Sequence, residues 1–318
     1  MGYLQRLLPF LIALGFANDA GHFIEHVAHV QDFVEVFSGM QAITNGARSF
    51  AYTGTPIDKK HGDLYNLLMP AGFLCCLSAL MRVRRGGFFF LAPPCSTWIF
   101  FSSGSTGRTR SRPLGTKAKS MYIKSQNRLV SRICHLLWIA FQRGVYVIIE
   151  QPLSSMMEHH PRFRKLMRIF RYFTVELDMG SFGGFSQKPT KLFGNAPWVR
   201  KLAKKLTKWE KKVIQMAPEH ATVTKFYIDK HGNKKCSAGK GCKKTQSYPI
   251  GFGAANAMHY DEFVKSGSTS SDEFACNYSD SEPSNYDSDL EDMFADFEVG
   301  PEDFWAMHCP VDQVPEED

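Results

Sequence analysis

Two short and almost wholly apolar runs constrain the fold of this chain more than any other feature. Residues 87–92 read Gly-Phe-Phe-Phe-Leu-Ala, and residues 145–149 read Val-Tyr-Val-Ile-Ile. Strands that are apolar on both faces belong in sheets covered by helices on both sides, and such sheets are largely parallel. The sequence therefore predicts an α/β domain.

The segments around these two runs alternate between strand and helix patterns, which predicts a mostly parallel central sheet. Residues 192–260 are less regular. Within them, 192–247 are expected to form a small basic insertion, with a Lys-rich helix near 198–213 and a hairpin across Lys230-His231-Gly232-Asn233. The other expected strands are 32–37, 55–58 and 173–177, and the expected helices lie within 38–52, 64–81, 127–142 and 161–170.

The charge is distributed very unevenly along the chain. Residues 266–318 hold 16 Asp and Glu and no Lys or Arg, so residues 1–265 carry 38 basic against 15 acidic side chains, a net charge of +23. A domain this basic favours a nucleic-acid partner, with a merely well-solvated surface as the alternative. We expect a helical extension over 1–30, one domain over 31–265, and a disordered acidic tail over 266–318, which is poor in apolar residues and could fold back on the basic domain or bind another protein.

The eight cysteines are irregularly spaced and do not suggest a disulfide framework. We expect a reducing, intracellular location, with the nucleus favoured by the expected partner, although the apolar run 7–16 could also be a targeting segment. No stretch reaches the roughly 20 apolar residues that span a bilayer, so no membrane partner is expected. The His22, His26 and His29 face and the Cys236 and Cys242 pair each lack further clear ligands, and no metal site is predicted.

Ligands of parallel α/β sheets bind at the carboxyl ends of the strands, which makes the residues after each strand candidates for function. Phe37-Ser38-Gly39 follows the first strand and would let the backbone approach a cofactor. Asp58 comes 19 residues after Gly39, near the offset at which an acidic side chain binds a ribose diol. The alternative for Asp58 is a structural cap of a turn.

Two further strand ends carry reactive side chains. In Ala92-Pro93-Pro94-Cys95, the prolines end the strand and hold Cys95 rigidly, in the position of a nucleophile. Glu150 directly follows the second apolar run, where a carboxylate is costly unless it has a partner or a task. A structural role is the alternative for each. Arg108, Arg110 and Arg112 follow in a Ser/Gly/Thr-rich loop expected to be flexible, and could favour the thiolate of Cys95.

The order of these segments resembles the DNA (cytosine-5) methyltransferases, particularly the divergent methyltransferase-like proteins of dinoflagellates and other algae. Residues 34–39 are similar to the first motif of the family, Ile57-Asp58 to the second, Pro93-Pro94-Cys95 to the Pro-Cys motif and Glu150-Gln151-Pro152 to the Glu-Asn-Val/Pro motif. Residues 180–193 resemble the later Gln-x-Arg-x-Arg motif, with Gln187 matching and Lys191 in place of the last arginine. Residues 248–258 are a poor match to the final motif.

The resemblance implies a Rossmann-like fold that binds S-adenosylmethionine through Phe37, Ser38, Gly39, Asp58 and Pro93. It implies that Cys95 attacks carbon 6 of a flipped cytosine in DNA while Glu150 binds ring nitrogen 3 and the amine. Lys191 would assist at the cytosine carbonyl oxygen. Gln187 and the arginines of the loop 102–112 (Arg108, Arg110 and Arg112) would contact the nucleic acid.

The sequence also departs from the pattern of the family. Met40 and Gln41 stand where glycines are usual, Pro189 and Lys191 replace paired arginines, and no large target-recognition domain fits between 195 and 247. Two alternatives therefore stay open beside an active cytosine-5 methyltransferase. One is a catalytically degenerate, nucleic-acid-binding protein with the same fold, for which a link to a mobile element is one origin. The other is methyl transfer to an exocyclic amine or to RNA.

Overall fold

A computed structural model describes residues 30–116, 121–170, 172–218, 223–228, 230, 232 and 234–267. The chain divides into a first unit, 1–270, and a second, 271–318, and every described residue belongs to the first. The expected helical extension and almost all of the expected acidic tail lie outside the described residues, so both remain predictions.

The described part of the first unit is built on a six-stranded mixed sheet in the order β2-β1-β3-β4-β6-β5. Strands β1 to β4 run parallel to one another, and β6 pairs antiparallel with both β4 and β5. The expected α/β class with a mostly parallel sheet is therefore confirmed. The strands are β1 (Gln31–Val36), β2 (Gly54–Ile57), β3 (Val83–Leu91), β4 (Tyr146–Pro152), β5 (Phe173–Asp178) and β6 (Pro189–Gly194).

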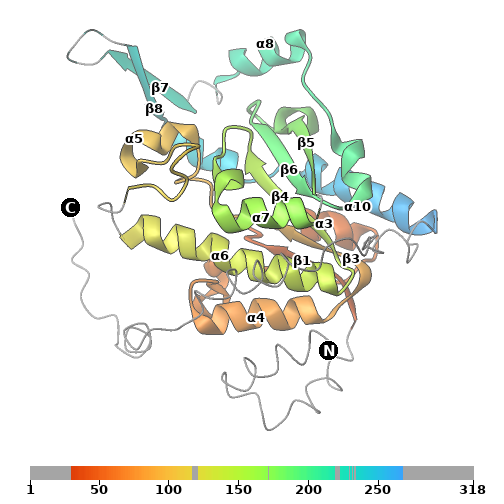
Figure 1. Cartoon of the computed structure of the whole chain (residues 1–318). Helices are drawn as coiled ribbons and strands as arrows, with labels where there is room; N and C mark the ends of the chain where they lie inside the picture. Colours follow the sequence, from red (N-terminus) through yellow and green to blue (C-terminus); the bar gives the residue numbers. More distant parts are fainter. Residues whose placement is uncertain are drawn as a thin grey trace, which may run out of the picture. The chain divides into compact units, whose positions relative to one another are not determined.

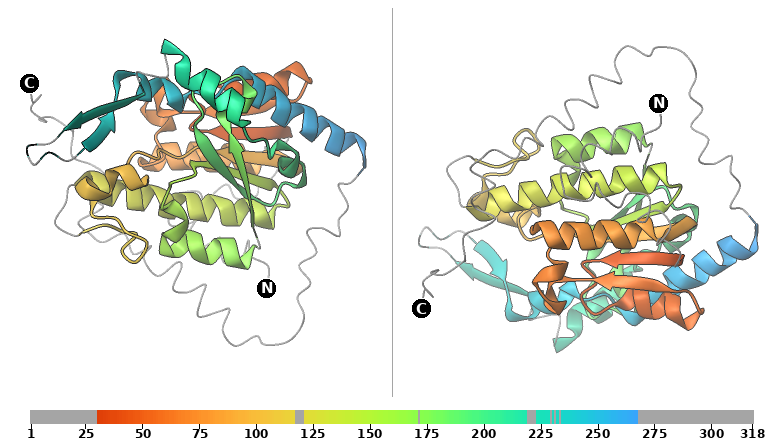
Figure 2. Two further views of the ribbon diagram at one scale, coloured as in Figure 1. Left: turned by 90° about the horizontal axis from the view of Figure 1, so that it is seen from above. Right: turned by 90° about the horizontal axis from the view of Figure 1, so that it is seen from below.

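Helices cover both faces of the sheet, as the apolar strands require. Helices α4, α6 and α7 lie on one face, and α3 and α10 lie on the other (Figures 1 and 2). Within β3, Phe88, Phe89 and Phe90 have no exposed surface. The helices are α3 (Ala42–Ser49), α4 (Pro70–Met81), α5 (Ser103–Thr106), α6 (Met121–Gln142), α7 (Pro161–Ile169), α8 (Lys208–Met216) and α10 (Ile250–Lys265).

The order of the strands reverses at β1. The chain passes from β1 outward to β2 and then returns to β3 on the other side of β1. At such a reversal the loops after the two central strands diverge, and ligands of open α/β sheets bind there. The residues after β1 and β3, which the sequence singled out, both lie at this reversal.

Helices α3 and α10 cross with their backbones in very close contact. A Cβ atom added to Gly46 would lie 2.3 Å from the carbonyl oxygen of Gly253, and one added to Gly253 would lie 1.9 Å from that of Ala42. Only glycine permits this approach. Beneath the crossing, the aromatic rings of Phe33 and Phe88 stack at 5.2 Å, and Tyr260 of α10 packs edge-on against Phe88 at 4.8 Å.

Three local expectations differ from the structure. The Lys-rich helix expected near 198–213 is a 3-10 turn, Pro197–Leu202, followed by α8, because Thr207 caps a new helix by accepting from the Glu210 N–H at 3.2 Å. The segment 189–194, noted only as part of a motif, is a strand. The irregular end of the domain contains the long helix α10. The hairpin is confirmed, as β7 (Thr224–Ile228) and β8 (Lys234–Ala238).

Candidate functional site

The loop after β1 has an unusual backbone conformation. Phe37, Gly39 and Gln41 have φ angles of 59°, 49° and 58°, and side chains other than glycine rarely adopt this left-handed conformation. Such strained positions concentrate at ligand sites, where the surrounding structure holds them. The first turn of α3, which starts directly after Gln41, has no side-chain cap at its N-cap residue. The cap comes instead from Glu35, whose carboxylate accepts the Thr44 N–H of that turn.

Asp58 holds this loop in shape. Its carboxylate accepts the Gly39 N–H at 2.8 Å and the Lys60 N–H at 2.9 Å, so it links the end of β2 to the end of β1. The expected ribose contact and the alternative structural cap are both compatible with this position, since each carboxylate oxygen can accept a second hydrogen bond. Beside it, the buried Ser38 hydroxyl has no hydrogen-bond partner within the described part of the chain.

Glu35 supports the same region from within the sheet. Its carboxylate accepts from the Thr44 N–H at 2.8 Å and from the Thr44 hydroxyl at 2.5 Å, which fixes the start of α3 against β1. Burial raises the pKa of Glu35 to about 7, although the hydrogen bonds from Thr44 oppose this shift. Glu35 therefore changes protonation near neutral pH.

The strand end that carries Cys95 is fastened to its neighbour. Gln151, in β4, donates its side-chain N–H to the Pro93 carbonyl at 2.7 Å and accepts from the Ser155 hydroxyl at 2.9 Å. Proline leaves its carbonyl as the only backbone polar group available here. The Gln151 contact therefore holds the Pro-Pro-Cys segment that follows β3 against the end of β4.

Cys95 and Glu150 lie close enough for the charge of one to affect the other. Cys95 is a half-buried free cysteine whose pKa is raised to about 11, first by burial and then by the negative charge of Glu150. The positive charge of Lys188 acts in the opposite direction. In the ligand-free site Cys95 is therefore a thiol at neutral pH.

Glu150 is buried and held by two residues that the sequence reasoning did not single out. Its carboxylate accepts from the Tyr248 hydroxyl at 2.8 Å and pairs with the Lys188 ammonium group at 3.3 Å. That ammonium group also lies over the Tyr248 ring, 4.8 Å from its centre. Both residues fall in segments similar to family motifs, and this position was the only signal that could have drawn attention to them.

Lys191 lies elsewhere. In the antiparallel pairing of β4 with β6, Lys191 is opposite Gln151, whereas Glu150 is opposite Leu192. Residues directly opposite one another share a face of a sheet, so Lys191 is on the other face from Glu150. Its ammonium group contacts Glu158 at 2.7 Å. The lysine that contacts Glu150 is Lys188, and a role for Lys191 at the cytosine remains a prediction.

The arginine loop after Cys95 separates into a buried and an exposed part. Arg108 has no exposed surface, lies over the Trp98 ring at 3.5 Å and donates to the Asn127 side chain at 2.8 Å. Burial lowers the pKa of Arg108 to about 10. The expectation that Arg108 is a flexible phosphate contact is therefore wrong, because it anchors the loop. Arg110 and Arg112 are exposed, as that role requires.

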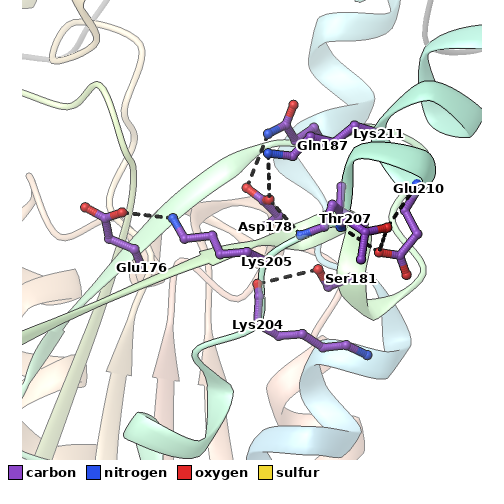
Figure 3. A network of polar contacts seen from close by, with 10 residues as sticks. Glu176, Asp178, Ser181, Gln187, Lys204, Lys205, Thr207, Glu210 and Lys211 are labelled. Carbon is purple, nitrogen blue, oxygen red and sulfur yellow. Dashed lines mark hydrogen bonds and ion pairs between the residues drawn. The ribbon is translucent and has the colours of Figure 1, made fainter.

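Gln187 belongs to a separate network around the buried Asp178 (Figure 3). Asp178 accepts the Leu206 N–H at 2.9 Å, lies 3.9 Å from the Lys211 ammonium group, and is 3.5 Å from the Gln187 amide. These contacts tie α8 and the segment before it to the end of β5. A contact of Gln187 with nucleic acid remains a prediction.

No protein-family model matches this chain, and no curated protein matches it as a relative. Within the part of the chain that the structure describes, no three His, Cys, Asp or Glu side chains are grouped to hold a metal. No helix among the same residues is long and apolar enough to cross a membrane.

Proposed function

We propose that this protein is an S-adenosylmethionine-dependent methyltransferase that acts on carbon 5 of cytosine in DNA through Cys95. One observation carries the proposal. The ends of the adjacent parallel strands β3 and β4 bring a rigidly held cysteine beside a buried glutamate, and a lysine lies within contact distance of that glutamate. A nucleophile, an acid and a cation in one site at the carboxyl edge of the sheet are the parts that this reaction needs.

The residues of the β1 loop fit the cofactor. The buried Ser38 hydroxyl, which has no partner among the described residues, offers a hydrogen-bonding group at the reversal between β1 and β3, and Asp58 holds the neighbouring Gly39 N–H. When bound there, S-adenosylmethionine supplies the methyl group. The half-exposed Phe37 provides an apolar surface at the same loop.

In this mechanism the Cys95 thiol gives its proton to the Glu150 carboxylate and begins the reaction as a thiolate. Its sulfur adds to carbon 6 of a cytosine that has left the base stack, and the electron pair of the 5,6 double bond moves toward carbon 5 and ring nitrogen 3. A protonated Glu150 donates to nitrogen 3 and stabilises this charge. Once carbon 5 is methylated, loss of its proton returns the electron pair, re-forms the double bond and releases the thiolate.

Glu150 also regulates its neighbour. While Glu150 is ionised, its charge raises the pKa of Cys95. A proton on Glu150, shared with nitrogen 3 of the bound base, removes this effect and leaves the Lys188 cation to favour the thiolate. Base binding and thiol activation are coupled in this way, which keeps the nucleophile protected in the empty site.

The test is a mechanism-based trap. A DNA oligonucleotide that contains 5-fluorocytosine cannot lose a proton from carbon 5, so the enzyme stays covalently attached after methyl transfer. We expect wild-type protein with S-adenosylmethionine to form an adduct that mass spectrometry maps to Cys95, and Cys95→Ser to form none. Cys75→Ser, which changes another half-buried cysteine, in α4, is the matched control and should form the adduct normally. No wild-type adduct on single- or double-stranded DNA would contradict the proposal.

A second candidate is a nucleic-acid-binding protein that has the fold without catalysis. Met40 and Gln41, which stand where the family usually has glycines, favour this candidate. Gln41 adopts a left-handed conformation, and its amide contacts His61 at 3.3 Å across the loop. That contact narrows the space for a ligand. Titration calorimetry with S-adenosylmethionine separates the two candidates, since the degenerate protein gives no heat of binding but still binds DNA with a steep salt dependence.

A further inference from the structure

Two neighbouring cavities run along the surface between the loop after β3, the loop after β4 and helix α7. The first has a volume of about 450 Å³ and the second about 570 Å³. Arg110, Glu158 and His159 line both, so the two cavities adjoin along one surface. We call it the α7 groove and use this name for the surface lined by Phe100, Arg110, Glu158, His159, Arg164 and Arg168.

Two walls of the α7 groove are formed by the loops that follow Cys95 and Glu150. The loop after Cys95 and the loop after Glu150 are joined by the Met156 N–H to Trp98 carbonyl bond at 2.7 Å and the Phe100 N–H to Ser154 carbonyl bond at 3.3 Å. Only four residues separate Cys95 from Phe100. The two loops that form the groove therefore begin at the strand ends that carry Cys95 and Glu150.

The groove carries a net positive charge. Arg110, Arg164 and Arg168 are exposed, and none of them forms an ion pair with another described residue. Glu158 is the only acidic residue that lines the two cavities, and its charge is balanced by Lys191 at 2.7 Å. Burial lowers the pKa of His159, which is therefore neutral at pH 7. Three cations remain to attract an anionic ligand.

An exposed aromatic ring lines the first cavity of the groove. Phe100 is 73% exposed, so its ring is accessible to a ligand. A row of cations beside an accessible ring is the combination that binds single-stranded nucleic acid, because the cations contact phosphates and the ring stacks on a base. In a duplex the bases are already stacked on one another, and the ring has no free base face to cover.

We propose that the α7 groove binds a single-stranded segment of the nucleic acid, with Phe100 stacked on one base and Arg110, Arg164 and Arg168 along the backbone. The inference rests on the proposed function in naming this strand as the methylation substrate. It assigns substrate positioning to α7, since no large recognition domain fits between residues 195 and 247.

The experiment measures binding by fluorescence anisotropy, with the full chain carrying Cys95→Ser so that no covalent adduct forms. The probes are a labelled single-stranded DNA of about 12 nucleotides and the duplex of the same sequence. Arg164→Gln with Arg168→Gln should weaken single-strand binding at least tenfold and reduce the slope of log K against log salt by about 1.4. Phe100→Ala should weaken single-strand binding about five- to tenfold without changing that slope.

Matched controls come from α8, which does not line the groove. Lys208→Gln with Lys212→Gln makes the same charge change at the same spacing, and Trp209→Ala removes a ring that is 69% exposed. Both controls should bind within about twofold of the parent. Equal losses in the α7 and α8 variants would overturn the proposal, and so would a Phe100→Ala loss that is as large for the duplex.

The two proposals fail separately. If the 5-fluorocytosine adduct forms in wild-type protein but the α7 variants bind single strands normally, the groove proposal alone is wrong. If the α7 variants lose single-strand binding and no adduct forms on any DNA, the groove proposal stands and the proposed chemistry is wrong.

Discussion

The carboxyl edge of the sheet has two halves that use their polar side chains differently. At the ends of β1 and β2, Asp58 and Glu35 bind backbone N–H groups and so determine the shape of a loop and of the start of a helix. At the ends of β3 and β4, Glu150 contacts the side chains of Tyr248 and Lys188 and acts electrostatically on Cys95. A substitution in the first half should change stability, whereas one in the second half should change reactivity.

The largest expected effect tests the second half. Glu150→Gln keeps the size of the side chain and an oxygen that can accept from the Tyr248 hydroxyl. It removes the acidic proton and the negative charge. The yield of the 5-fluorocytosine adduct per unit time should fall at least about 100-fold. Alkylation of Cys95 by iodoacetamide at pH 8 should rise several-fold, because the pKa of Cys95 falls when the neighbouring negative charge is lost.

Glu176→Gln is the control for this prediction. Glu176 is exposed and pairs with Lys205 at 2.8 Å, away from Cys95. Both readouts should stay at wild-type values in the control. If Glu150→Gln lowered the alkylation rate together with the adduct, the electrostatic coupling of Glu150 and Cys95 would be refuted.

The second prediction concerns Glu35 and pH. Its pKa is about 7 in the folded protein against an ordinary value of 4.5, so the folded state retains a proton between these pH values that the unfolded chain has lost. Stability is therefore lost as the pH rises from about 4.5 to 7, by an amount on the order of 3 kcal/mol. Between pH 5 and pH 8, wild-type protein should lose about 2 to 3 kcal/mol more than Glu35→Gln in urea unfolding. Parallel pH profiles would contradict this account.

A third prediction addresses the loop itself. Asp58→Ala removes the acceptor of two N–H groups and should lower the free energy of unfolding by about 1 to 3 kcal/mol. The same variant should weaken S-adenosylmethionine binding in calorimetry, because the β1 loop loses its fixed shape. Asp63→Ala, an exposed acid in the next turn, should change neither quantity. If Asp58→Ala left the free energy of unfolding unchanged, Asp58 would not be needed to hold the β1 loop in its shape.

The smallest effect distinguishes two lysines. Lys188→Gln removes the cation that favours the Cys95 thiolate, so the pKa of Cys95 should rise further and alkylation at pH 9 should slow about threefold. Lys191→Gln should leave that rate unchanged, because its ammonium group contacts Glu158. Peptide mapping of the alkylated protein assigns the rate to Cys95. If Lys191→Gln slowed alkylation and Lys188→Gln did not, Lys191 would be the cation that acts on Cys95.

The parts of the fold that local patterns specify were predictable. The apolar runs became β3 and β4, and α6 and α7 lie where the helical pattern placed them. Helix α10 was missed because Gly251 and Gly253 lower helix propensity, and the reason for Gly253 is a contact with α3 some 200 residues earlier in the chain. Distant packing of this kind leaves no local signal.

The site was predictable to a similar degree. Proline, cysteine and glutamate at strand ends identified Cys95 and Glu150, because the strand pattern fixes where those residues must lie. The partners of Glu150 were not identified, since Tyr248 comes from a segment 98 residues away. Arg108 was misjudged because composition described its loop as flexible, whereas a single stacking contact with Trp98 buries it.

The crossing of α3 and α10 has a consequence for how the protein is made. On the ribosome, β1 and α3 emerge first, but the helix that covers α3 is synthesised about 200 residues later. The part of the sheet next to α3 therefore stays uncovered until α10 has been synthesised. Contacts between such distant segments slow folding. A nascent or truncated chain that ends before α10 would expose the rings of Phe33 and Phe88, which makes chaperone binding during synthesis an expected part of the life of this protein.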